Sequence, residues 1–309
     1  MINLTIRNAY MIMAHNNWSQ LKLLISLLDD TYNDFYIHID SKVKNVDMQD
    51  IKKAVKYSKV YFTRRISIRW GGYGTIEASM ILLEAATKLN YDYYHLMSGN
   101  DLPLKSNQTI NDFLVKNMYE NNSRAKMTNY MTYGLVEQEI VRARVSHYNI
   151  LVPFFRCTPK CIGVVCKKIN AMAYHVQRNI GIDRIKKYGM KLYKGSIWYI
   201  ISHECANFLL ENRGKGKKLF GHFTFSGDEF VLQTLVVNSY LKDTLYHSRE
   251  SINSNLYEID WELTKGDGSP HLFTMKDVEK LENSENFYAR KFDVNVDEEI
   301  VKYITKKCN

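Results

Sequence analysis

Apolar runs of strand length alternate with amphipathic helical patterns over the first hundred residues. Short runs rich in β-branched and aromatic residues predict buried strands, and apolar residues three and four positions apart predict helices. The predicted strands are Ala9–Ala14, Asp34–Ile39, Lys59–Thr63 and Tyr93–Ser98. The predicted helices are Trp18–Leu28, Asp50–Tyr57 and Thr75–Leu89. This alternation predicts an α/β fold with a mostly parallel, Rossmann-like sheet and helices on both faces.

The pattern is less regular in the second half of the chain. Residues 121–191 contain basic segments of helical character that are interrupted at Pro153. Regular pattern returns with a strand at Ser196–Ser202, helices at His203–Leu210 and from 225 to about 241, and a helix at Thr274–Leu281 before an acidic and basic tail. Turn residues dominate around Lys265–Pro270. No repeat or low-complexity linker divides the chain, so we expect a single domain over residues 1–309.

Composition and charge narrow the classes of partner. The chain has 45% hydrophobic and 24% charged residues, as expected for a folded protein with a sizeable core. Its net charge of +9 favours anionic partners such as nucleic acid, acidic lipid headgroups or phosphorylated molecules. The densest basic cluster, Lys215, Lys217 and Lys218, is typical of a solvated loop. Because no nucleic-acid-binding motif occurs, we expect no nucleic-acid partner.

The cysteines and the apolar segments bear on the compartment. The spacing of Cys157, Cys161 and Cys166 does not match a zinc site, and five cysteines form no paired framework. We therefore expect reduced thiols and no metal centre. No window of membrane-spanning length is apolar. The expected location is cytoplasmic, with basic and apolar surface that suits peripheral contact with the inner face of a membrane.

Candidate chemistry begins at the carboxyl ends of the predicted strands, where parallel sheets bind ligands. His15, Asp40 and Asp101 each follow a strand, and three polar strand ends in one sheet favour a site over ordinary loops. The sequence has neither a P-loop, a dinucleotide fingerprint nor an Asp-x-Asp pair for a metal-bound diphosphate. A diphosphate would then need side-chain cations, and the adjacent Arg290 and Lys291 are candidates. The alternative is an ordinary surface Arg-Lys pair.

A second candidate lies in the stretch from 225 to 235, FSGDEFVLQTL. Ser226 and Glu229 have the spacing of a capping box, in which the glutamate would only start a helix. A carboxylate held at a rigid helix start is also well placed to act as a general base. The two roles remain open on these residues alone.

Several blocks occur in the order found in a known family. They are Tyr36–Lys42, Trp70–Gly72, Leu96–Lys105, Gly195–Ser196, Ile259–Trp261, Ser269–Pro270 and Tyr288–Asp293. From about residue 9 to 297 the chain resembles the core-2/I-branching enzymes of glycosyltransferase family 14. That family contains β-1,6-N-acetylglucosaminyltransferases and peptide O-xylosyltransferases. Residues 121–190 match no block of the family.

The resemblance implies a GT-A-like, inverting glycosyltransferase that uses a UDP-sugar and needs neither metal nor cofactor. Residues 1–120 would be the nucleotide-binding half, and residues 121–309 the acceptor and catalytic half. The expected sugar is GlcNAc and the expected acceptor is a glycan or a lipid-linked oligosaccharide. The alternatives are a xylosyltransferase-like enzyme using UDP-xylose and a non-catalytic sugar-binding relative.

The resemblance also assigns roles to individual residues. Glu229 falls on the general base, although this chain reads Ser-Gly-Asp-Glu where the family usually has a proline. Arg290 and Lys291 fall on the cations that bind the donor diphosphate. The remaining expectations are donor binding by His15, Asp40 and Asp101, and acceptor binding by Trp261 and Asp228.

Two departures from the family affect the expected substrate. The animal enzymes have a membrane anchor and disulfides that this sequence lacks, so we expect a bacterial-type member acting in capsular or exopolysaccharide synthesis. Ile197 stands where xylosyltransferase-like sequences often have an acid. This disfavours a peptide serine as acceptor.

Overall fold

The computed structural model describes residues 5–118, 126–247, 253–262 and 269–308. Its main sheet has the order β3-β2-β1-β4-β8. The strands β1 (Asn8–Ala14), β2 (Asn33–Ile39), β3 (Val60–Phe62) and β4 (Tyr93–Ser98) are parallel, and β8 (Tyr199–Ser202) is antiparallel to β4. The prediction of a mostly parallel sheet is therefore confirmed. Because β8 pairs with β4, the sheet joins both predicted halves of the chain.

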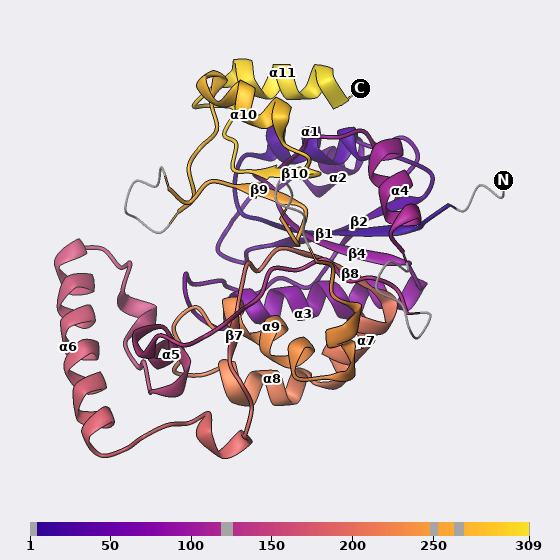
Figure 1. Cartoon of the computed structure of the whole chain (residues 1–309). Coiled ribbons are helices and arrows are strands. Elements are labelled where there is room, and N and C mark those ends of the chain that lie inside the picture. Colours follow the sequence, from indigo (N-terminus) through magenta and orange to yellow (C-terminus); the bar gives the residue numbers. More distant parts are fainter. Residues whose placement is uncertain (1–4, 119–125, 248–252, 263–268, 309) are drawn as a thin grey trace.

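Helices cover both faces of this sheet (Figure 1), as the α/β prediction required. On one face lie α1 (Trp18–Leu27), α2 (Met48–Lys52) and α4 (Asn107–Lys116). On the other lie α3 (Gly74–Ala86), α7 (His203–Glu211) and α9 (Asp228–Val237), with α8 (Arg213–Phe220) packed on α9. The remaining helices are α5 (Glu139–Ser146), α6 (Lys160–Asn179), α10 (Val278–Asn283) and α11 (Glu298–Cys308). None of the described helices is both long and apolar enough to span a bilayer.

A smaller sheet carries the C-terminal segments to the end of β4. Its order is β5 (Leu102–Pro103), β10 (Tyr288–Arg290) and β9 (Tyr257–Ile259). It packs with α10, α11 and the end of α1 around a second hydrophobic core. A third pair, β6 (Gly134–Leu135) with β7 (Tyr193–Lys194), lies near α9. Short 3₁₀ helices cover Thr87–Leu89, Val152–Phe154, Lys186–Tyr188, Tyr240–Thr244 and Met275–Asp277.

Three helices occupy segments where the sequence suggested none, and one of them is α4. The tail is the helix α11, whose Ile300, Val301 and Ile304 are buried at helical spacing in the second core. The expected solvated loop at Lys215–Lys218 is part of α8, because Leu219 and Phe220 bury against the main core.

The helix expected at Asp50–Tyr57 is α2, which begins earlier and ends at Lys52. Asp47 caps its start by accepting the N–H groups of Gln49 and Asp50. The carboxylate of Asp29 accepts the N–H groups of residues 56, 57 and 58 and thereby holds that segment in a loop. The turn-rich segment expected at Lys265–Pro270 lies mostly outside the described residues.

Candidate active site

Glu229 lies in the first turn of α9 and is held by two cations. Its Oε2 is 3.0 Å from Nη2 of Arg144 and 3.1 Å from Nζ of Lys194, and its side chain is 30% exposed. The expected capping box is wrong, because Ser226 has a left-handed φ of 51° and no side chain caps the helix. Instead the Ser226 N–H donates to the carbonyl of Gly71. The carboxylate of Glu229 is thus half-exposed and oriented by cations rather than by its own helix.

The segment from Gly195 to Trp198 packs against this helix start. The Gly195 N–H donates to the carbonyl of Glu229 at 2.9 Å, and Nε2 of Gln233 donates to the carbonyl of Ser196 at 2.6 Å. A Cβ on Gly195 would lie 2.0 Å from the carbonyl oxygen of Thr132. Only glycine fits this approach, which explains its place in the Gly-Ser block.

Asp228 points in a different direction from Glu229. It lines a cavity of about 20 Å³ between α3, α9 and the sheet, together with Thr75, Ile197 and Tyr199. Its buried Oδ1 has no hydrogen-bond partner in the described part of the chain. Burial, and then the charge of Glu229, raise the pKa of Asp228 to about 7. The expected role in acceptor binding stays a prediction for a side chain that faces the interior.

Arg290 is brought to the end of β4 by the small sheet. Its Nη1 lies 3.4 Å from Oδ1 of the fully buried Asp101, and its guanidinium carbon lies 4.1 Å from the ring centroid of Trp198. The Arg290 side chain is only 12% exposed. Burial raises the pKa of Asp101 to about 6, and the charge of Arg290 opposes this shift. The alternative of an ordinary surface pair is therefore wrong for Arg290.

Lys291, His15 and Asp40 share one electrostatic neighbourhood. Partial desolvation lowers the pKa of His15, the charge of Asp40 opposes this shift, and the charges of Lys42 and Lys291 add to it. Asp40 is buried, accepts the N–H groups of Lys42 and Ile68 at 2.9 and 3.3 Å, and lies 3.3 Å from Nζ of Lys42. Asp40 thus organises the two loops after β2 and β3, beside an exposed histidine and a lysine. Donor binding by these residues stays a prediction.

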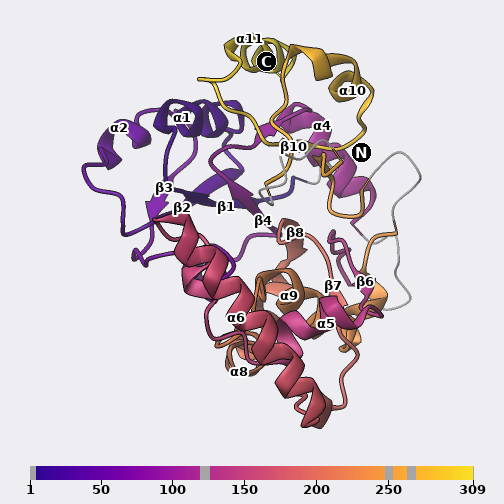
Figure 2. The ribbon, with the colours of Figure 1, turned by 90° about the vertical axis from the view of Figure 1, so that its left-hand side faces the viewer.

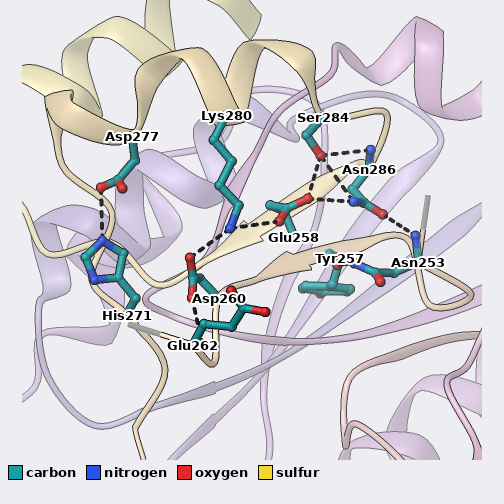
Figure 3. A network of polar contacts seen from close by, with 10 residues as sticks. All are labelled: Asn253, Tyr257, Glu258, Asp260, Glu262, His271, Asp277, Lys280, Ser284 and Asn286. Atoms are coloured by element: carbon teal, nitrogen blue, oxygen red, sulfur yellow. Dashed lines mark hydrogen bonds and ion pairs between the residues drawn. The ribbon is translucent and has the colours of Figure 1, made fainter. Parts of the chain in front are cut away.

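Trp261 is 55% exposed and directly follows Asp260 in the chain. Asp260 belongs to the network of polar contacts drawn in Figure 3. Its carboxylate is 2.7 Å from Nζ of Lys280 in α10. Glu258 in turn accepts from Ser284 and Asn286, each at 2.9 Å. The network fixes the backbone on the N-terminal side of the indole, so the ring is displayed from an anchored position. Such a ring suits stacking on a sugar face.

The segment from Gly195 to Trp198 contacts both the surroundings of Glu229 and Arg290. The Gly195 N–H donates to the backbone carbonyl of Glu229. Three residues later, the ring of Trp198 packs against the guanidinium of Arg290. The same short stretch of chain therefore contacts both the helix start that carries Glu229 and the guanidinium of Arg290.

Comparison with known proteins shows to which family the chain belongs. The family model of the Core-2/I-branching enzymes matches residues 8–285. The chain belongs to the Core-2/I-branching enzyme family. This is a family of glycosyltransferases, as the ordered blocks had implied.

Similarity to individual Core-2/I-branching relatives is distant but extends along the chain. A xylosyltransferase of Ciona intestinalis is 20% identical over 98% of this chain and 34% of its own length. Human xylosyltransferase 2 is 22% identical over 97% of this chain and 33% of its own length. A human β-1,3-galactosyl-O-glycosyl-glycoprotein β-1,6-N-acetylglucosaminyltransferase is 20% identical over 94% of this chain and 66% of its length. The chain thus spans about a third of the xylosyltransferases that it matches.

Among solved structures, core-mannan synthase A from Aspergillus fumigatus aligns with a TM-score of 0.35 and 10% identity. The alignment covers 78% of this chain and 72% of the synthase.

Some residues of this Core-2/I-branching site were not found by sequence reasoning. Arg144 lies in the region without family blocks, and nothing in its surroundings signals a partner for Glu229. Lys194 directly precedes the Gly-Ser block, which was the available signal. Trp198 lies two residues after that block, but its place against Arg290 depends on tertiary packing.

No metal centre is formed by the described residues, where no three histidine, cysteine or carboxylate side chains converge. All five cysteines are described and free. Metal independence stays a prediction that a chelator can test.

Proposed function

We propose that this Core-2/I-branching enzyme transfers GlcNAc from UDP-GlcNAc to a hydroxyl of a glycan, with inversion and without a metal ion. The observation that carries the proposal is Glu229, a half-exposed carboxylate oriented by Arg144 and Lys194. A general base must be accessible and held in position, and here two cations orient a carboxylate that is partly exposed. A lipid-linked oligosaccharide in capsular or exopolysaccharide synthesis is the acceptor that we propose.

The proposed reaction is a single displacement. An acceptor hydroxyl attacks the anomeric carbon from the face opposite UDP while Glu229 takes its proton. The bond between the anomeric carbon and the diphosphate oxygen breaks, and UDP leaves with the electron pair. Arg290 and Lys291 stabilise the charge on the departing diphosphate, in the role that a metal ion would otherwise have. Asp101 and Trp198 support this role by holding the guanidinium in place.

A xylosyltransferase-like activity with UDP-xylose is the second candidate. Of the three relatives named above, two are xylosyltransferases and one is an N-acetylglucosaminyltransferase. Ile197 argues against a peptide acceptor. Its apolar side chain lines the interior cavity together with Asp228. Xylosyltransferase-like sequences often have an acid at this position, and isoleucine cannot replace the contacts of a carboxylate with a peptide.

The test is release of UDP from a panel of UDP-sugars, with and without a glycan acceptor and with and without EDTA. We expect acceptor-dependent release from UDP-GlcNAc that EDTA leaves unchanged. Activity that requires an added divalent ion would refute the metal-free mechanism. Preference for UDP-xylose would favour the second candidate.

Glu229→Gln tests the base directly. We expect kcat to fall by about 10²- to 10⁴-fold, with UDP affinity unchanged. Glu204→Gln is a matched control, because Glu204 also lies in the first turn of a helix and pairs with a lysine, Lys126. Turnover of the Glu229 variant close to that of the control would remove Glu229 from the mechanism.

A further inference from the structure

The helix α6 packs against the protein through its polar side. Nδ2 of Asn170 donates to Oδ1 of Asn149 at 2.9 Å, and Gln177 exchanges two hydrogen bonds with the backbone of Tyr148. The hydroxyl of Tyr174 also donates to Glu139 of α5 at 3.1 Å. Gly163 is the one residue of α6 that is fully buried. The polar side of α6, which on an ordinary surface helix would face solvent, is therefore hydrogen-bonded to the rest of the protein.

The apolar residues of α6 face outward. They recur at intervals of three and four, which places them in one stripe along the helix. Their exposed fractions are 45% for Ile162, 53% for Val165, 50% for Ile169, 69% for Met172 and 60% for Val176, and Ile180, just beyond the helix, is 68% exposed. A surface helix of a globular protein turns such a stripe toward the core, so this one fits a partner that α6 meets from outside.

The segment that contains α6 is basic, although Glu139 and Asp183 at its two ends pair with Arg178 and Arg142. Between Glu139 and Asp183 the chain has seven lysines and arginines and no acid. On α6 itself, Lys160, Lys167 and Lys168 are exposed, and helical spacing places Lys168 next to the stripe. A second copy docked on α6 would bring two copies of this basic segment close together, which opposes self-association. An anionic membrane surface satisfies both features, because its headgroups attract the lysines and its acyl boundary accepts the apolar side chains.

We propose that α6 lies in the surface of an anionic membrane, with its stripe from Ile162 to Val176 inserted between the headgroups. Figure 2 shows α6 running across the side of the molecule toward which the parallel strands point. Binding through α6 would therefore turn the carboxyl edge of the sheet, where the candidate site lies, toward the membrane. The inference rests on the surface of α6 and not on the identity of the sugar.

The test measures co-sedimentation of the whole protein with vesicles of phosphatidylglycerol and phosphatidylcholine, and with vesicles of phosphatidylcholine alone. We expect binding to the anionic vesicles that weakens with salt. The double variant Ile169→Glu/Met172→Glu is expected to reduce this binding about tenfold or more, since it places two negative charges in the stripe that would insert into the membrane. The control Leu89→Glu changes an apolar side chain that is 42% exposed elsewhere on the surface, and we expect it to bind like the wild type.

Equal binding by the double variant and the wild type would overturn the proposal. So would a concentration-dependent dimer in sedimentation velocity that the double variant abolishes, if no vesicle binding accompanies it. Transfer to a water-soluble acceptor is expected to be unchanged in the double variant. Loss of vesicle binding and failure of the proposed sugar transfer are therefore separate results.

Discussion

Replacement of Asp228 by asparagine is expected to stabilise the protein at neutral and higher pH. The buried Oδ1 of Asp228 has no partner among the described residues, and burial together with the charge of Glu229 raises its pKa from 3.8 to about 7. Between pH 3.8 and about pH 7, Asp228 is protonated in the folded protein and ionised in the unfolded chain. The contribution to stability is therefore present at low pH, is lost as the pH rises toward 7, and is constant above that. Asparagine has the same shape and stays neutral throughout.

The size of the effect follows from the pH interval. From about pH 5 to a pKa of about 7, the change corresponds to about 3 kcal/mol at 1.36 kcal/mol per pH unit. Because the side chain is only partly buried, water screening reduces this to about 1 to 2 kcal/mol. We expect the stability of Asp228→Asn, relative to the wild type, to be greater by this amount at about pH 8 than at about pH 5.

Urea unfolding followed by circular dichroism at the two pH values provides the measurement. Asp243→Asn is the control, since it makes the same chemical change at a residue that is exposed in the 3₁₀ helix Tyr240–Thr244. The same difference for Asp228→Asn at both pH values would refute the reasoning. A variant less stable than the wild type at about pH 8 would refute it as well.

Two further substitutions test the packing around the site. Gly195→Ala should lower the free energy of unfolding by about 2 to 4 kcal/mol, because its Cβ would lie 2.0 Å from the carbonyl oxygen of Thr132; a loss below about 1 kcal/mol in urea unfolding would contradict this. Arg290→Gln should destabilise the protein by about 3 to 5 kcal/mol, because it leaves Asp101 buried without its cation, and should weaken UDP binding in calorimetry. Adding Asp101→Asn should restore most of the stability but not the UDP affinity. Recovery of both would separate Arg290 from the donor.

Much of the architecture could be predicted from local pattern. The four parallel strands follow from short apolar runs, and the polar residues at their ends follow from the chemistry of parallel sheets. The helix α11 was missed because its charged residues outweigh four buried positions in composition, although Ile300, Val301 and Ile304 have helical spacing. There the period of the pattern was more informative than its overall polarity.

The partners in the site were harder to predict than its central residues. Glu229 and Arg290 could be singled out because a carboxylate at a helix start and an Arg-Lys pair suggest a chemical role. Arg144 contacts Glu229 only because α5 packs beside α9. The capping box failed for a related reason. Ser226 has the sequence of a cap, but its backbone is bonded to Gly71 from a distant loop, so tertiary contacts override the local motif.

The core of the nucleotide-binding half depends on a residue that is synthesised late. Nδ1 of the fully buried His95 lies 3.0 Å from the hydroxyl of Tyr288, 193 residues further along the chain. At 5 to 20 residues per second, a ribosome needs roughly 10 to 40 s to add that stretch. During this interval the buried His95 lacks its hydroxyl partner, and until β8 is synthesised the outer edge of β4 is also unpaired. Nascent protein should therefore rely on chaperones until Tyr288 emerges, and slower translation should lower the yield of folded enzyme.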